Sequence, residues 1–329
     1  MRKKIAIYEA TFEGAAKYTK IFKKIKGLSI ITLLDEPTRK CKDDKKFENI
    51  YSWSNKMILN FLQNNGVDRV LFFSHRFQDV MLANYLKKNG ILCFYVQHGY
   101  YEITSMKRTL NVILRKFHRF KTIIQRSQYA IWHFKELLYL FLPLLNHWVF
   151  LNNFNKNFIN PFHKFFVFNE FWKKQHANIY NCNSDVTYIV GNFDYKNLFE
   201  SSIVNKKHNR IYICQSLFED GRIKKSQMMN LISNLKNIDA IKYHPRSIRN
   251  FYKNLDAVEI DRIPQGSMVI GHYSSLLISA KEMGCDVELV EIPGHEIPNS
   301  FLKELSNTKI NSASCYQENP EQLIFKELF

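Results

Sequence analysis

The sequence predicts an α/β protein with doubly wound parallel sheets, and two observations support this. Short apolar runs, such as 5–10, 91–96 and 210–214, alternate with longer segments of helical period. Polar residues follow the ends of several of these runs. This alternation is typical of buried parallel strands joined by crossover helices. Because the carboxyl ends of such strands share one edge, where ligands bind, we expect the polar residues to line one cleft.

The elements divide into two series. In the first series we expect strands at 5–10, 28–34, 68–73, 91–96, 165–168 and 186–190, and helices at 15–26, 50–64, 77–89 and 170–180. In the second we expect strands at 210–214, 238–243, 267–270 and 287–290, a helix from Ser275 that Gly284 closes, and a C-terminal helix from about 319. The polar stretch 201–209 lacks apolar period and suits a linker. We therefore predict an N-terminal domain over 1–200 and a C-terminal domain over 201–329.

Composition narrows the function. The chain has 329 residues, 15% of them aromatic, and a net charge of +17, which suits a phosphate-bearing partner such as a nucleotide, a nucleic acid or an anionic membrane. It contains no GxGxxG or Walker loop, so a dinucleotide enzyme or P-loop NTPase is not expected. None of its six cysteines forms a CxxC pair, and no signal peptide opens the chain. We expect a cytoplasmic protein with reduced thiols.

A basic, aromatic-rich segment at about 107–164 interrupts the first series. Its most apolar part, 137–145, is too short for a membrane span of ~20 residues. Interleaved cations and rings favour a region that lies on an anionic membrane surface. Two alternatives remain open: a helical insertion packed on its own domain, and a platform for single-stranded nucleic acid. The chain has no RNP, KH or zinc signature to support the latter.

Three polar motifs follow predicted strands of the second series. In each, hydroxyl, imidazole or carboxylate groups are placed for chemistry on a phosphate: an acid can act as general base, a histidine can protonate a leaving phosphate, and serines at a helix start can hold one. Each also has an ordinary structural explanation as an acidic turn, a turn histidine or a helix cap. The motifs are Glu219-Asp220-Gly221, His244-Pro245-Arg246, and Gly271 with Ser274-Ser275.

A fourth polar group follows the strand at 91–96. Gln97, His98 and Gly99 would lie on the edge of the first domain that faces the second. They are candidates for the cleft or for contact with an acceptor. Gly99 is also explained by a tight turn alone.

The ordered set of acid-acid-Gly, His-Pro and Ser-Ser motifs resembles bacterial sialyltransferases of the lipooligosaccharide and polysialic-acid types. The resemblance implies a GT-B fold with two Rossmann-like domains facing across a cleft. It also implies inverting transfer from a CMP-sugar, with no metal or other cofactor. By this resemblance Asp220 would be the general base, His244 would assist departure of CMP, and Ser274 and Ser275 would hold its phosphate. Gln97-His98-Gly99 is similar to capsule-polysaccharide and glycerophosphate transferases that use cytidine-linked donors.

The expected function is therefore a glycosyltransferase on the inner face of the cytoplasmic membrane. It would move sialic acid or another nonulosonic acid from a CMP-sugar to a capsule or lipooligosaccharide acceptor, without a nucleic-acid partner. The alternatives are a Kdo or glycerophosphate transferase with a cytidine-linked donor, and a non-catalytic basic protein that binds membrane or nucleic acid. The sequence leaves open the sugar, the acceptor and the oligomeric state.

Overall fold

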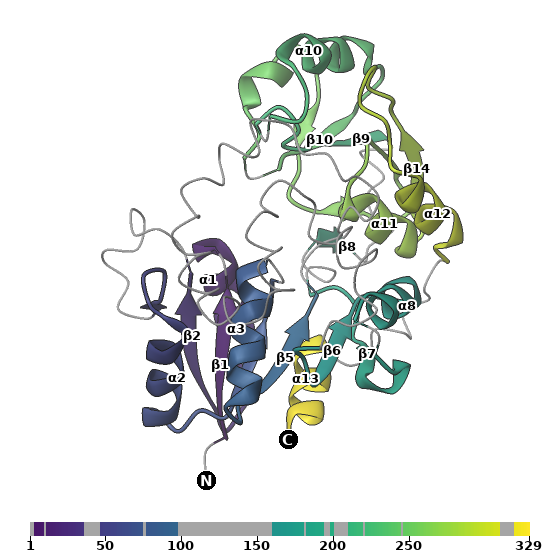
Figure 1. The fold of residues 1–329 in the computed structure, drawn as a ribbon. Coiled ribbons are helices and arrows are strands. Elements are labelled where there is room, and N and C mark those ends of the chain that lie inside the picture. Colours follow the sequence, from purple (N-terminus) through teal and green to yellow (C-terminus); the bar gives the residue numbers. More distant parts are fainter. Residues whose placement is uncertain are drawn as a thin grey trace.

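The computed structural model describes residues 3–9, 11–35, 47–74, 77–97, 160–180, 182–193, 198–200, 210–219, 221–244, 246–309 and 319–329. Two parallel sheets, each with helices packed against it, form two Rossmann-like units (Figure 1). The predicted α/β fold class is confirmed.

The first sheet has seven strands in the order β3-β2-β1-β4-β5-β6-β7, and every pairing is parallel. Its strands are β1 (Lys3–Glu9), β2 (Leu28–Leu34), β3 (Glu48–Asn49), β4 (Arg69–Phe72), β5 (Leu92–Val96), β6 (Lys164–Val167) and β7 (Thr187–Ile189). Its helices are α1 (Phe12–Phe22), α2 (Asn55–Asn64), α3 (Phe77–Lys88) and α8 (Glu170–Ile179), with a 3-10 turn at Ser184–Val186.

Strand β1 shows why this sequence forms a sheet buried on both faces. Successive side chains in a strand point to opposite faces. Ala6 and Tyr8 accordingly pack in one hydrophobic core, whereas Ile5 and Ile7 pack in the other. A continuous apolar run therefore fits a central parallel strand.

The second sheet has five parallel strands in the order β11-β10-β9-β13-β14. They are β9 (Arg210–Ile213), β10 (Ala240–Lys242), β11 (Val258–Glu259), β13 (Met268–Gly271) and β14 (Asp286–Leu289). The associated helices are α10 (Lys225–Asn234), α11 (Ser275–Glu282) and α12 (Asn299–Asn307), with a 3-10 turn at Arg249–Tyr252. Strands β8 (Phe199–Glu200) and β12 (Ile263–Pro264) form a separate pair. The strand order reverses between β9 and β13, which makes their carboxyl ends the topological switch point.

The C-terminal helix α13 (Pro320–Leu328) packs on the first sheet, not the second (Figure 1). Ile324 and Leu328 are buried in the same core as Ile5 and Ile7. The Lys164 ammonium donates to Glu327 Oε2 at 2.9 Å, which fixes the helix to β6. The range predicted for the second domain, 201–329, thus ends in a helix that covers the first sheet.

Helices α11 and α12 meet α8 of the first unit (Figure 1). Asn169 caps α8 by accepting from Trp172 N, and its Nδ2 donates to Glu282 Oε1 at 3.2 Å and to Glu304 Oε1 at 3.4 Å. Both glutamates are buried, and each is 4% exposed. Burial raises the pKa of Glu304 to about 8; the Asn169 hydrogen bond opposes this and the nearby Glu282 adds to it. One amide therefore joins two buried carboxyls across the domain interface.

Among the helices that the structure describes, none combines the length and apolar character needed to cross a membrane. Most of the predicted insertion at 107–164 lies outside the described residues, so its membrane-surface role stays a prediction.

Candidate functional site

Three loops meet at the carboxyl edge of the second sheet. The loop after β9 lies between the loops after β10 and β13, because β9 is the strand between β10 and β13. Gln215 Oε1 accepts from Tyr273 N at 3.1 Å, which joins the loop after β9 to the loop after β13. The Arg246 guanidinium donates to Ser216 Oγ at 3.0 Å, which joins it to the loop after β10. Side chains from all three loops thus line one edge at the switch point.

The acidic motif lies in the loop after β9. Glu219 Oε1 accepts from Ile248 N at 2.7 Å and so ties this loop to the one after β10. Gly221 has a φ of 69°, in the left-handed region that glycine adopts without strain, and its N–H closes a turn on Phe218 O. Asp220 lies outside the described residues, so its role as general base stays a prediction.

The histidine motif follows β10. His244 Nδ1 accepts from Arg246 N at 3.2 Å. In a neutral ring this leaves the proton on Nε2. Pro245 lies outside the described residues.

The serine motif begins helix α11. Ser274 is the N-cap, and its Oγ accepts from Leu276 N at 3.2 Å, so its own proton remains to be donated. Ser275 is the first helical residue and is partly exposed. A Cβ on Gly271 would lie 3.2 Å from Leu277, so glycine lets α11 approach the end of β13. The motif therefore places two hydroxyls at the positive end of a helix.

The group predicted for the first domain is placed differently. Gln97 is 1% exposed. Its side-chain Oε1 accepts from Phe168 N at 3.0 Å, and its backbone N–H donates to Phe166 O at 2.8 Å. Its side chain therefore ties the ends of β5 and β6 together inside the first unit. His98 and Gly99 lie outside the described residues.

The first sheet has polar groups of its own at the switch between β1 and β4. The Tyr8 hydroxyl lies 2.8 Å from both Asp35 Oδ2 and Asp79 Oδ1, and all three side chains are buried. Glu9, 2% exposed, lies against the first turn of α1, where a Cβ on Gly14 would be 2.8 Å from the Glu9 carboxyl carbon. In many Rossmann domains a phosphate occupies this position. Here an acidic side chain occupies it.

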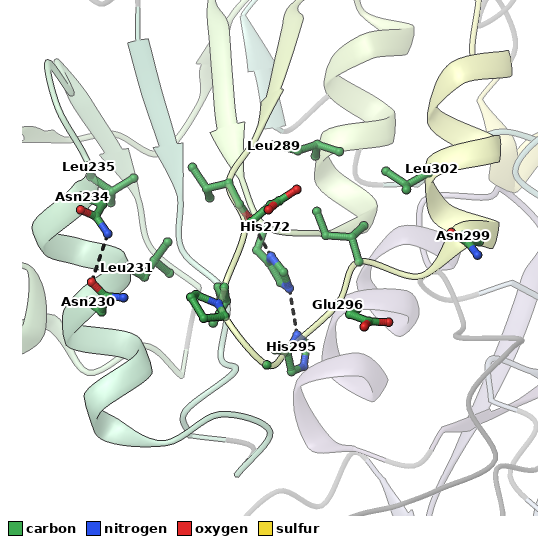
Figure 2. Close-up of a pocket in the computed structure, with 16 residues that line it drawn as sticks. Asn230, Leu231, Asn234, Leu235, His272, Leu289, His295, Glu296, Asn299 and Leu302 are labelled. Carbon is green, nitrogen blue, oxygen red and sulfur yellow. Dashed lines mark hydrogen bonds between the residues drawn. The ribbon is translucent and has the colours of Figure 1, made fainter.

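Two histidines that the sequence did not single out face a cavity next to α11 (Figure 2). His272 Nδ1 is 2.7 Å from Val290 O, a carbonyl that can only accept, so Nδ1 carries a proton. His272 Nε2 is 2.8 Å from His295 Nδ1, so in the neutral pair His295 Nδ1 is the donor. Burial lowers the pKa of both rings, and positive neighbours lower that of His295 further.

The surroundings hold this pair in place. The Tyr273 ring stacks on His295 with centroids 6.1 Å apart and planes at 18°, and the Arg222 guanidinium donates to the Tyr273 hydroxyl at 3.0 Å. A signal for His272 exists in the sequence, since it comes two residues after the strand predicted at 267–270. His295 has none, because it reaches the site through an irregular loop after β14.

The sequence matches no family model, and no curated protein matches it either. Solved structures with a related fold include S. aureus MnaA with UDP, at 12% identity and TM-score 0.49, covering 100% of this chain and 96% of that one. They also include the Neisseria meningitidis UDP-GlcNAc 2-epimerase bound to UDP-GlcNAc, at 12% and 0.47, covering 99% of both chains. A third is a variant of the wall teichoic acid polymerase TagF, at 9% and 0.46, covering 99% of this chain and 81% of that one. The prediction of two Rossmann-like units is confirmed by the two parallel sheets themselves.

The comparison corrects the predicted identity. The resemblance to sialyltransferases is wrong, and so is the CMP-activated acidic sugar as partner: several neighbours are named as UDP-GlcNAc 2-epimerases, and some of the structures contain UDP or UDP-GlcNAc. The cytidine-linked and non-catalytic alternatives find no support either. The physical reason is that each motif has only two or three residues. Any doubly wound domain places polar residues after its strands, so such short matches identify the architecture and not the donor.

Proposed function

We propose that this protein is an enzyme that binds a nucleoside-diphosphate sugar at the carboxyl edge of the second sheet. The observation that carries the proposal is that two arginines belong to the loops that meet at the switch point, where α11 also begins. Arg246 contacts the loop after β9, and Arg222 contacts Tyr273, the residue before the Ser274 cap. A helix N-terminus with hydroxyl donors and guanidinium groups suits a diphosphate.

The start of α1 in the first unit is unsuited to a phosphate, which supports placing the diphosphate in the second unit. A phosphate at the start of α1 would meet the buried Glu9 carboxyl beside Gly14. The diphosphate therefore belongs to the second unit. The sugar nucleotide itself is an inference by analogy with the GT-B-like fold.

Within this proposal the chain supplies the positive charge without a metal. The α11 dipole and the two guanidinium groups would stabilise the diphosphate, and in this proposal His244 donates a proton to it. Activity should then persist after treatment with EDTA. A complete loss that Mg²⁺ or Mn²⁺ restores would contradict metal independence.

Thermal unfolding with nucleotides tests the binding step. UDP is the first probe because it is the nucleotide named in the neighbours' structures; UDP-GlcNAc follows, and CMP, with one phosphate, is the comparison. A ligand at 100 times its Kd stabilises by about 2.7 kcal/mol, so the unfolding midpoint should rise with UDP and less with CMP. Arg246→Gln should reduce the rise. Lys236→Gln is the matched control, since this exposed lysine precedes β10 at the opposite edge of the sheet.

The reaction is then read by NMR of the UDP-sugar. Free UDP in the presence of an acceptor indicates transfer, whereas a new UDP-sugar without an acceptor indicates epimerisation. If neither nucleotide shifts the midpoint, or if Arg246→Gln behaves as wild type, the proposed site is wrong.

A further inference from the structure

The cavity that contains the two histidines differs in chemistry from the arginine-containing edge beside it. It has a volume of about 780 Å³ and lies between α10, the loop after β14 and the start of α12 (Figure 2). We call it the His pocket. Its polar side chains are Asn230, Asn234, Asn299, His272, His295, Glu291 and Glu296. Its apolar side chains are mainly leucine, isoleucine and valine.

The charge of the groups that line the His pocket disfavours a phosphate. Its lining contains two glutamates and no lysine or arginine, in a protein whose net charge is +17. An anionic group placed there would meet Glu291 and Glu296, whereas Arg222 acts on His295 from outside the lining and already donates to the Tyr273 hydroxyl. The pocket therefore accepts an uncharged part of a ligand, or an uncharged ligand.

The lining also argues against a nucleobase. Flat bases are commonly held by stacking on phenylalanine, tyrosine or tryptophan, and none of these lines the His pocket. Carboxamides offer both donors and acceptors, as sugar hydroxyls do. Asn230 and Asn234 lie one turn apart on α10, with Asn234 Nδ2 donating to Asn230 Oδ1 at 3.1 Å, so they present a paired amide surface.

The histidine pair adds a fixed acceptor. The Val290 carbonyl sets the proton on His272 Nδ1, and this sets the proton on His295 Nδ1. In the neutral pair His295 Nε2 is then left with a lone pair. The Tyr273 stack holds the ring in this orientation. A hydroxyl that donates to Nε2 would be recognised by direction as well as by position.

We propose that the His pocket is a binding site for an uncharged sugar unit, separate from the diphosphate site at α11. Amide pairs, an oriented imidazole acceptor, carboxylate acceptors and apolar walls without cations match a saturated, polyhydroxylated ring. The volume lies within the ~300–1,000 Å³ of ordinary small-molecule sites and accommodates a mono- or disaccharide.

Saturation-transfer NMR on the full chain tests this without a nucleotide. The probes are glucose, N-acetylglucosamine and cellobiose, with glucose 6-phosphate as the charged comparison and uridine as the aromatic one. We expect transfer to the neutral sugars, with glucose 6-phosphate at least about tenfold weaker, a difference of ~1.4 kcal/mol. His295→Phe keeps a ring on Tyr273 but removes the acceptor, and Asn234→Leu removes one amide from an exposed helix position. Both should weaken the neutral sugars.

Ser233→Ala is the matched control, because Ser233 is exposed on the same helix but does not line the pocket. It should leave binding unchanged. The proposal is overturned if no neutral sugar receives transfer, if both pocket variants bind sugars as wild type does, or if uridine or glucose 6-phosphate is the ligand that these variants lose. The sugar probes carry no diphosphate, so the two proposals are tested separately. Sugars can bind here even if UDP does not bind at α11, and UDP can bind there even if no sugar binds here.

Discussion

The buried carboxyl of Glu304 predicts a pH dependence of stability that one substitution should remove. Its pKa in the fold is about 8, mainly because of burial, whereas the ordinary value is 4.5. Between these two values the folded protein keeps a proton that the unfolded chain releases. The free energy of unfolding therefore falls as pH rises through this window, by about 1.4 kcal/mol per pH unit, or roughly 4–5 kcal/mol in all.

Glu304→Gln isolates this contribution. Glutamine has the shape of the protonated acid and can still accept from Asn169 Nδ2. We expect the variant to match wild type near pH 5 and to be more stable at pH 8. At about 2–4 °C per kcal/mol, the midpoint difference at pH 8 should be several degrees or more.

The assay is the unfolding midpoint of both proteins at half-unit steps from pH 4.5 to 8.5. Other groups titrate in this range, so the difference between the two curves carries the result. Glu48→Gln, an exposed glutamate on edge strand β3, is the control and should give a flat difference. A flat difference for Glu304→Gln as well would show that Glu304 ionises at an ordinary pH in the fold, and the interface argument would fail.

Three further substitutions test separate contacts. Tyr8→Phe removes the hydroxyl between buried Asp35 and Asp79 and should cost about 1–3 kcal/mol in urea unfolding; no loss would show that these acids have other sufficient partners. Ile324→Ala leaves a cavity under α13 and should cost about 2–5 kcal/mol, whereas a cost under ~1 kcal/mol would mean that the helix is not firmly docked. Ser274→Ala should cost about 1 kcal/mol as a lost cap and should also weaken UDP; a stability loss with unchanged UDP affinity would limit Ser274 to capping.

The sequence predicts strands well where burial is two-sided. A run such as 5–10 reads as a central parallel strand because both faces of β1 are covered, and the structure places Ile5 and Ala6 in opposite cores. The edge strands β3 and β11 have two residues each and cannot be predicted from the sequence pattern, because two residues are too few to show a period. Helix α13 is predictable as a helix, but its partner is not. Only the folded chain shows that Ile324 lies beside β1.

The candidate site also contains residues that the sequence predicts and residues that it does not. Glu219, His244 and Ser274 are found from the sequence because each belongs to a polar motif two to six residues after the end of a strand, and parallel strands bring their carboxyl ends together. This rule specifies an edge and not a ligand, which is why short motifs led to the wrong donor. His295 shows the limit most clearly. It comes six residues after the end of β14, in a loop that returns to His272 through the Ile292–His295 bridge. Its tautomer depends on a carbonyl, Val290, whose position is a property of that loop alone. Site residues that belong to motifs after regular strands can therefore be predicted from a sequence. Site residues that an irregular loop brings into place can be found only in the folded structure.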